Sequence, residues 1–286
     1  MGYPELSRGD RGEEVKLLQS LLNRVGAMLI ADGDFGSGTE RGVRYAQELA
    51  GQQNTGTVTR PLWVWLEENP EPYPLLDTNG VAFIASEETG GLSYYQEVCR
   101  WPHYPGHASG VTIGIGFDLR FNSEEQFRQL WQNHLPRKAM DELARDIGRA
   151  GSEKRVKELK RMGIEIPFAS AWAVFIEKTL PLYYLQTEAI FPSLATLPGL
   201  CRSVLVSIVF NRGNSLDGPG RKEMRAIRDI LARAADPHQH KRRVKMILEE
   251  VEDQIVAMKR LWNPASGVYK RRQAEANLWR TGLKDW

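Results

Sequence analysis

Two adjacent carboxylates, Glu87 and Glu88, occur in the segment ASEETGGLSYY at residues 85–95, directly before a pair of glycines. A carboxyl group in a partly desolvated position holds its proton more tightly and can act as a general acid. Cleavage of a glycosidic bond needs such an acid at the leaving oxygen, and a second group that delivers water or a nucleophile to the anomeric carbon. This chemistry therefore requires a partner for one of the two glutamates elsewhere in the chain.

A partner is available in residues 109–119, SGVTIGIGFDL, which alternate apolar with small or polar side chains as a β-strand does. The second face of this strand would carry Thr112, Gly114, Gly116 and Asp118. Because glycine weakens a strand, two glycines at alternate positions indicate that a ligand or another backbone approaches closely. The pattern predicts a floor for a sugar chain between Thr112 and Asp118, and a bulged edge strand is the alternative.

The segment that contains the two glutamates, GVAFIASEETGG, predicts a short apolar helix that ends near them. One glutamate would then project from the end of this helix toward the strand. Glu88 follows Ile84 by four residues and Glu87 follows Phe83 by four, so both lie on an apolar side of the helix. Periodicity leaves open which residue is the acid, and a solvated surface carboxylate is the alternative for either one.

The N-terminal part of the chain has a helical pattern of its own. Apolar residues recur there at three- and four-residue spacings, which predict three helices at residues 12–26, 39–50 and 59–68. Three prolines in ENPEPYPLLDTNG, residues 68–80, indicate a stiff linker. This organisation gives a domain at 1–68, a linker at 69–79 and a second domain at 80–286.

The second domain has mostly helical patterns. A capping box of Ser123 and Gln126 opens one helix, and Pro181 should kink or divide another. The strand at 109–119 is the one convincing β signal. We therefore expect a mainly α (α+β) protein with a small β-sheet.

Composition limits the class of protein and its partners. The 286 residues are 42% hydrophobic and 26% charged, as in ordinary soluble globular proteins. Residues 1–70 carry a net charge of −3 and the remainder carries +5, which suits an acidic polymer such as cell wall, lipopolysaccharide or nucleic acid. Only Cys99 and Cys201 are present, and we expect both to be buried thiols. No apolar run approaches the ~20 residues that a membrane span requires, and the N-terminus lacks the apolar region of a signal peptide. We therefore expect synthesis in the cytoplasm.

Other chemistries have weaker support. His103 and His107 are separated by Pro105 and Gly106, and no HExxH motif occurs, so we expect neither a metal site nor a cofactor. Ser215 has no evident histidine partner for nucleophilic catalysis. The basic helical run at 221–245 lacks interleaved aromatics, so it predicts a solvated face or a contact with an anionic membrane, and no nucleic acid.

The N-terminal motifs carry a first resemblance. LSRGDRGEEVKLLQSLLN, DGDFGSGTERGVRYAQ and TGTVTRPLWVWL follow in order and cover residues 6–66 almost continuously. They resemble the first peptidoglycan-binding domain family, which implies a three-helix domain that binds the cell wall without catalysis.

The later motifs carry a second resemblance. ASEETGGLSYY, WPHYPGHASGVTIGIGFDLRFN, SIVFNRGNSL and GVYKRRQAEANLW together look like the catalytic domain of phage-type lysozymes, closest to the pesticin-like branch. In that family the acid stands seven residues before a tyrosine, and the register from Tyr95 selects Glu88. Glu87 then becomes a neighbour that helps to raise the pKa of the acid. The resemblance implies that Thr112 and Asp118 hold the water, with Glu97 as the alternative to Asp118.

The two resemblances together imply a modular muramidase. Such an enzyme hydrolyses the β-1,4 bond between N-acetylmuramic acid and N-acetylglucosamine. With no positioned nucleophile we expect inversion, for which the carboxyl groups stand roughly 6.5–9.5 Å apart. We expect the saccharide site to include Tyr95, Glu97, Gly114, Gly116 and Asn211. Tyr95 and Asn211 could equally be packing residues.

A phage endolysin is the setting that we expect, made in the host cytoplasm without a signal peptide and acting on the periplasmic wall after release. The expected partners are peptidoglycan and an anionic outer-membrane surface, and the chain is expected to be a monomer. A lytic transglycosylase, a secreted antibacterial toxin and a non-catalytic wall-binding protein are the alternatives.

Overall fold

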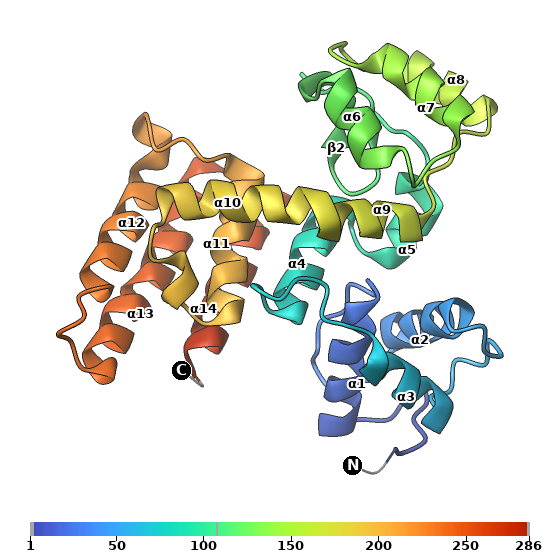
Figure 1. Ribbon diagram of the computed structural model, residues 1–286. Helices are drawn as coiled ribbons and strands as arrows, with labels where there is room; N and C mark the ends of the chain where they lie inside the picture. Colours follow the sequence, from blue (N-terminus) through green and yellow to red (C-terminus); the bar gives the residue numbers. More distant parts are fainter. Residues whose placement is uncertain (1–2, 107, 285–286) are drawn as a thin grey trace. The chain divides into compact units, whose positions relative to one another are not determined.

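The computed structural model describes residues 3–106 and 108–284 and is mostly helical (Figure 1). The described residues contain one two-stranded antiparallel sheet. These features confirm the expected mainly α class with a small sheet. The chain forms two compact units: a first unit of the residues up to Pro72 with Ala85–Leu180, and a second unit of Tyr73–Ile84 with the residues from Pro181 onward. None of the described helices is both long and apolar enough to cross a membrane.

Three amphipathic helices form the N-terminal part of the first unit: α1 (Glu13–Arg24), α2 (Ser37–Leu49) and α3 (Arg60–Glu68). Their apolar faces meet in one core. Val15, Leu18, Leu22, Val43, Ala46, Leu62 and Leu66 are completely buried in it. A backbone bridge from Leu6 to Val58 ties the N-terminal segment to the start of α3. The predicted three-helix domain is therefore present, although α2 begins two residues earlier than the predicted range.

Buried polar side chains hold the glycine-rich turn between α1 and α2. The amide of Gln19 donates to Asp32 at 2.8 Å and accepts from the Gly33 N–H at 2.8 Å. Burial raises the pKa of Asp32, but the hydrogen bonds that it accepts from the Asp34 N–H and from Gln19 outweigh burial and lower it. Gly33 has a φ of 80°, which a side chain would strain. These contacts are the physical reason for a glutamine in α1 and an Asp-Gly-Asp turn after it.

The remaining elements of the first unit include the sheet. They begin with α4 (Thr78–Thr89), whose residues from Ala85 belong to this unit. The next are α5 (Leu92–Tyr94), the π-helical turn η1 (Tyr95–Cys99), β1 (Thr112–Ile113), β2 (Phe117–Asp118) and the 3₁₀ turn η2 (Leu119–Phe121). They continue with α6 (Glu124–Trp131), α7 (Arg137–Leu143), η3 (Ala144–Asp146), α8 (Glu153–Arg161), α9 (Phe168–Val174) and the π-helical turn η4 (Phe175–Thr179).

The prediction of a single strand at residues 109–119 is wrong, because the chain forms a hairpin within this segment. β1 and β2 form a hairpin in which Thr112 pairs with Asp118 and Ile113 pairs with Phe117. Gly114 and Gly116 have φ angles of 57° and 72°, which glycine adopts without strain. The glycines therefore form the turn, and this explains them without a ligand. A Cβ on Gly114 would also lie 2.7 Å from the Trp131 ring.

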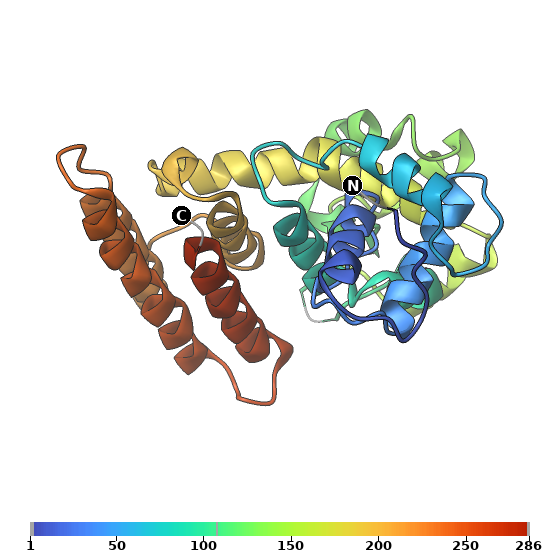
Figure 2. The same cartoon turned by 90° about the horizontal axis from the view of Figure 1, so that it is seen from below.

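The second unit is a helical bundle. Its elements are α10 (Leu180–Ile190), η5 (Leu194–Thr196), α11 (Gly199–Arg212), η6 (Pro219–Arg221), α12 (Lys222–Ala234), α13 (Lys241–Ala257), η7 (Met258–Leu261) and α14 (Gly267–Lys284). α12 and α13 lie side by side as a long antiparallel hairpin, and α14 packs against α11 and α13 (Figures 1 and 2). Pro181 is the second residue of α10. The π-helical turn η4 ends two residues before it and accommodates the missing N–H of the proline, in place of the kink or division that we expected.

A buried charge cluster, defined here as Ser207, Arg271, Arg272 and Glu275, joins α11 to α14. Oε1 of Glu275 accepts hydrogen bonds from Ser207 Oγ at 2.6 Å, Arg272 Nη2 at 2.8 Å and Arg271 Nε at 3.2 Å. All four residues are less than 5% exposed. The charges of the YKRRQAE segment thus hold two helices together inside the bundle.

The two cysteines are free and buried, as expected. Burial raises the pKa of the Cys99 thiol to about 11 and that of the Cys201 thiol to about 12. Both sulfurs therefore stay protonated at neutral pH. Cys99 belongs to the first unit and Cys201 to the second.

Candidate active site

Glu88 lies in the last turn of α4, one residue before the end of the helix. It is half-buried, whereas Glu87 is exposed. Gly90 and Gly91 follow the last helical residue, and they have φ angles of 74° and 93°, as is common after a helix C-terminus. The prediction that the glutamate pair lies at the end of a helix is therefore confirmed.

Thr112 lies at the centre of a polar row. On one side its N–H and carbonyl both bond to the backbone of His103, at 2.8 and 3.0 Å. On the other side it pairs with Asp118 without backbone hydrogen bonds, because the flanking bond runs from Leu119 to Val111. In antiparallel pairs, residues directly opposite place their side chains on the same face, and the pairs without hydrogen bonds are the closest. His103, Thr112 and Asp118 therefore form a row on one face of the sheet.

The Asp118 carboxylate is fixed by backbone donors. The Gly110 N–H lies 3.0 Å from both carboxylate oxygens, and the Arg120 N–H donates to Oδ1 at 2.8 Å. A Cβ at Gly110 would lie 2.5 Å from Asp118 Oδ1, so only glycine allows this close approach. Asp118 thereby caps η2 and holds a single orientation beside Thr112.

The hydroxyl of Thr112 is buried without a partner. Thr112 is 5% exposed, and its Oγ1 has no hydrogen bond to any residue that the structure describes. The Nδ1 atom of His103 is likewise buried without one. A buried polar group without a hydrogen bond costs about 1–3 kcal/mol, so such atoms are rare in stable folds. Two of them belong to paired residues of this row, and others occur elsewhere among the described residues, for example at Trp131 and Glu275.

Tyr95 and Asn211 are two polar residues expected at the saccharide site. Tyr95 is completely buried, its hydroxyl donates to the Ile166 carbonyl at 3.0 Å, and its ring contacts Phe168 edge-on at 4.9 Å. It therefore has the packing role that was the alternative to a sugar contact. Asn211 is exposed near the end of α11 in the second unit.

The three other residues expected at the saccharide site have local explanations. Gly114 is buried and Gly116 is exposed, and both belong to the hairpin turn. Glu97 is exposed on η1 and accepts a hydrogen bond from Ser93 Oγ at 3.2 Å. Of this set, only Glu97 lines the same groove as His103.

That groove runs between residues 97–104 and α8 and has a volume of about 320 Å³. The half-buried Trp101 ring forms part of its wall, with the Lys160 ammonium 5.2 Å from the ring centroid. His103 belongs both to this wall and to the polar row. Glu88, Thr112 and Asp118 are not among the residues that line the groove, so His103 is the one residue of the row that it shares.

The sequence prediction missed His103 as a member of the site. The sequence offers His103 only as a possible metal ligand together with His107, which lies outside the described residues. Its pairing with Thr112 is a bridge one residue long, and such a bridge leaves no periodic pattern in the sequence. Among the described residues no group of three or more His, Cys, Asp or Glu side chains could hold a metal ion.

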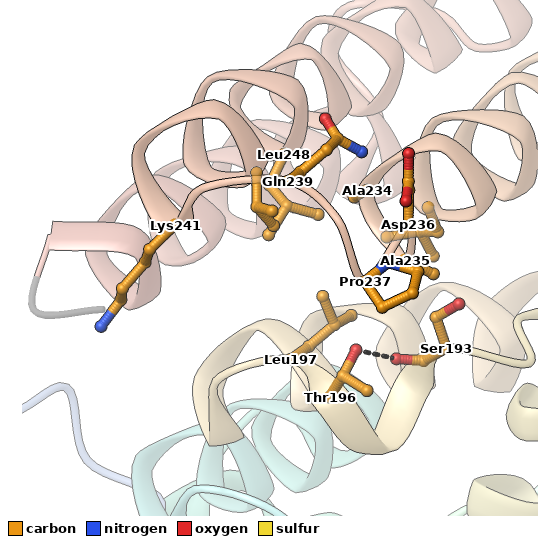
Figure 3. A pocket seen from close by; sticks show the side chains of 12 residues that line it. Ser193, Thr196, Leu197, Ala234, Ala235, Asp236, Pro237, Gln239, Lys241 and Leu248 are labelled. Carbon is orange, nitrogen blue, oxygen red and sulfur yellow. Dashed lines mark hydrogen bonds between the residues drawn. The ribbon is translucent and has the colours of Figure 1, made fainter.

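A second hollow, of about 320 Å³, lies within the second unit (Figure 3). It is formed by η5 and by the loop from α12 to α13, and Pro237 and Leu197 line it. The Thr196 hydroxyl near it donates to the Ser193 carbonyl at 2.8 Å. Asp236 is the one carboxylate among its lining residues, so the hollow lacks the acid and base pair of a glycosidase.

Comparison with known families assigns the N-terminal part of the chain. Residues 11–66 match the model of a family described as a peptidoglycan binding domain. The chain thus carries a peptidoglycan-binding domain at its N-terminus, which associates it with the cell wall. Residues 83–177 match the model of a family described as a domain of unknown function, and this range contains Glu88, the polar row and the groove. No curated protein matches the chain.

Proposed function

We propose that this protein is a peptidoglycan hydrolase that cleaves the β-1,4 bond between N-acetylmuramic acid and N-acetylglucosamine. The observation that carries the proposal is the pairing of Thr112 with Asp118, in a chain whose N-terminal domain belongs to the peptidoglycan-binding class. Glu88, half-buried at the end of α4, is the proposed acid.

The proposed reaction is a single displacement with inversion. Glu88 gives its proton to the leaving oxygen as the bond from the anomeric carbon to that oxygen breaks. A water bonds to the anomeric carbon from the opposite face and loses its proton to Asp118. Asp118 Oδ1 accepts two backbone N–H groups and Oδ2 accepts one, so Oδ2 keeps capacity for this water.

Asp118 is favoured over Glu97 as the base for a geometric reason. Asp118 is held rigidly opposite Thr112, whereas Glu97 is an exposed side chain on η1. A base must lie within hydrogen-bond reach of the proton that it removes, and a fixed carboxylate meets that requirement at a lower entropic cost.

Clearance of purified peptidoglycan tests the proposal. A positioned acid or base typically contributes 10²–10⁴-fold to the rate, so Glu88→Gln and Asp118→Asn should each lower kcat by at least about 100-fold. Glu97→Gln and Glu87→Gln should each cost less than about tenfold, and Glu125→Gln, at an exposed position on α6, is the matched control. An inert wild type would refute hydrolysis. A fully active Glu88→Gln variant would refute the assignment of the acid.

Analysis of the products separates hydrolysis from the related chemistry of a lytic transglycosylase. Hydrolysis with inversion should release reducing muramic ends that are first formed as the α-anomer, and NMR during the first minutes of the reaction detects this anomer. Ends with a 1,6-anhydro bond in the mass spectrum would contradict the role of Asp118. Wall binding without any cleavage would leave the non-catalytic alternative, which the N-terminal domain alone supports.

The proposed setting is lysis of a bacterial host by a phage, with the enzyme released to the periplasmic wall. A secreted antibacterial toxin with the same reaction is the alternative setting. The N-terminal domain supports both equally, because each requires binding to peptidoglycan.

A further inference from the structure

We propose that His103 is a positioning residue of this site and that it holds the attacking water together with Thr112 and Asp118. The inference rests on the proposed hydrolase function and deepens it, since it assigns a third residue to the water. The observation behind it is the row that the sheet forms, in which His103 and Asp118 pair with Thr112 from opposite sides.

The pairing geometry brings the three side chains together. The bridge of His103 with Thr112 has both backbone hydrogen bonds, and Thr112 with Asp118 is a close pair without them. Pairs of the first kind have Cα atoms about 5.5 Å apart and pairs of the second kind about 4.5 Å apart. Three polar side chains on one face at these spacings can contact one small molecule.

The hydrogen-bonding capacity of the row matches one water molecule. A neutral histidine with its proton on Nε2 presents Nδ1 as an acceptor, a threonine hydroxyl can donate, and a carboxylate only accepts. A water that donates to His103 Nδ1 and Asp118 Oδ2 and accepts from Thr112 keeps one lone pair for the anomeric carbon. This arrangement uses His103 Nδ1 and Thr112 Oγ1, two buried atoms that have no hydrogen bond to any part of the chain that the structure describes.

The charge state of His103 follows from its surroundings. Burial lowers the pKa of His103 and outweighs the Trp101 carbonyl and the Asp118 charge, which both favour the protonated ring. The other titratable groups that face the groove are Glu97, Tyr104, Glu153, Lys157 and Lys160. The imidazole is therefore neutral at pH 7, and protonation in acid would turn Nδ1 into a donor that cannot accept from the water.

Two substitutions at this position give opposite expectations. An asparagine side chain would place its amide oxygen near the position of Nδ1, so His103→Asn should keep kcat at pH 7 within about threefold. It should also remove the part of the acid decline in kcat that comes from histidine, because an amide does not titrate in this range. His103→Leu removes the acceptor and should lower kcat at least tenfold with a change in KM below about twofold. His238→Leu and His238→Asn, at an exposed position of the second unit, should leave kcat and its pH profile unchanged.

The pKa of the imidazole, measured by NMR on protein with labelled histidine, gives a second readout that needs no substrate. His103 should titrate below the ordinary value of about 6.5, and Asp118→Asn should lower its pKa further, because the aspartate charge favours the protonated ring. Thermal melts establish that each variant is folded. If His103→Leu unfolds, the pH dependence of kcat in His103→Asn and the titration of His103 still test the proposed role of His103.

The outcomes separate this inference from the proposed function. An active wild type, an inactive Glu88→Gln and an unchanged kcat in His103→Leu would overturn the role of His103 and leave the hydrolase standing. An ordinary pKa for His103, with the same acid decline in His103→Asn as in the wild type, would also overturn it. A wild type that does not cleave peptidoglycan would remove both.

Discussion

Two polar groups of the molecule, the Thr112 row in the first unit and the buried charge cluster in the second, use their hydrogen bonds in opposite ways. In the cluster, Oε1 of Glu275 accepts from a hydroxyl and two guanidinium groups, and the residue is completely buried. In the row, Asp118 is half-buried and bonded only to backbone N–H groups, and the Thr112 hydroxyl next to it has no bond among the described residues.

The difference teaches how to separate residues that hold the fold from residues that can act on a ligand. A carboxylate whose partners are buried arginines in its own helix contributes to folding, and no sugar can reach it. Oε2 of Glu275 also lacks a hydrogen bond among the described residues, so a missing partner alone does not separate the two groups. The half-burial of Asp118 does, because a ligand can approach a carboxylate that is partly exposed. Substitutions in the two groups should therefore affect stability and activity in opposite proportions.

The largest effect on folding is expected from Glu275→Gln. Removing one charge from a buried ion pair costs roughly 3–5 kcal/mol, because the other charge stays buried without its partner. Urea unfolding at neutral pH measures the loss. Glu250→Gln is the matched control, since Glu250 pairs with Arg233 at the surface, where an ion pair contributes only about 0–1 kcal/mol. Equal losses in the two variants would contradict a structural role for the cluster.

An intermediate effect is expected from Gly110→Ala. The new Cβ would lie 2.5 Å from Asp118 Oδ1 and 2.8 Å from the Arg120 nitrogen, so the carboxylate must move. Such overpacking costs roughly 1–3 kcal/mol, and we expect kcat to fall at least tenfold because the base is displaced. Gly220→Ala, with no atom within 4 Å of the added Cβ, serves as the control. Full activity of Gly110→Ala would show that the orientation of Asp118 is unimportant.

The smallest effect on folding is expected from Thr112→Val, which removes a buried hydroxyl without a partner and keeps the shape of the side chain. Stability should stay the same or rise by up to about 1 kcal/mol, whereas kcat should fall at least tenfold. Ser207→Ala in the cluster removes a hydroxyl that does have a partner and should destabilise by about 1–2 kcal/mol. Thermal melts and clearance assays on both variants give the comparison. A loss of stability in Thr112→Val as large as in Ser207→Ala would refute it.

The helical parts of the fold could be predicted from the sequence, and the turns could not. The spacing of Val15, Leu18 and Leu22 specifies a helix and its buried face without reference to the rest of the chain. The segment TIGIGFD alternates as a strand would, yet it is a hairpin, because Gly114 and Gly116 adopt positive φ angles. Alternation continues across a short turn, so it cannot tell one strand from two.

In the candidate site, too, some residues could be predicted from the sequence and others could not. Glu88, Thr112 and Asp118 could be selected from local patterns and a family resemblance. Tyr95 satisfied the spacing of that resemblance, but its environment depends on the distant Ile166 and Phe168, and it is a core residue. His103 enters the row through a single backbone bridge, which only the folded chain reveals. Local sequence patterns do not predict contacts between residues that are far apart in the sequence.

The two buried thiols make the units separately observable. A thiol reacts as the thiolate and only when reagent can reach it, so Cys99 and Cys201 should be modified only when the protein around each of them opens. Each unit contains one of them. The rates at which a reagent labels the two sulfurs therefore report local opening of the domain with the polar row and of the helical bundle independently, in one native sample and without an added probe.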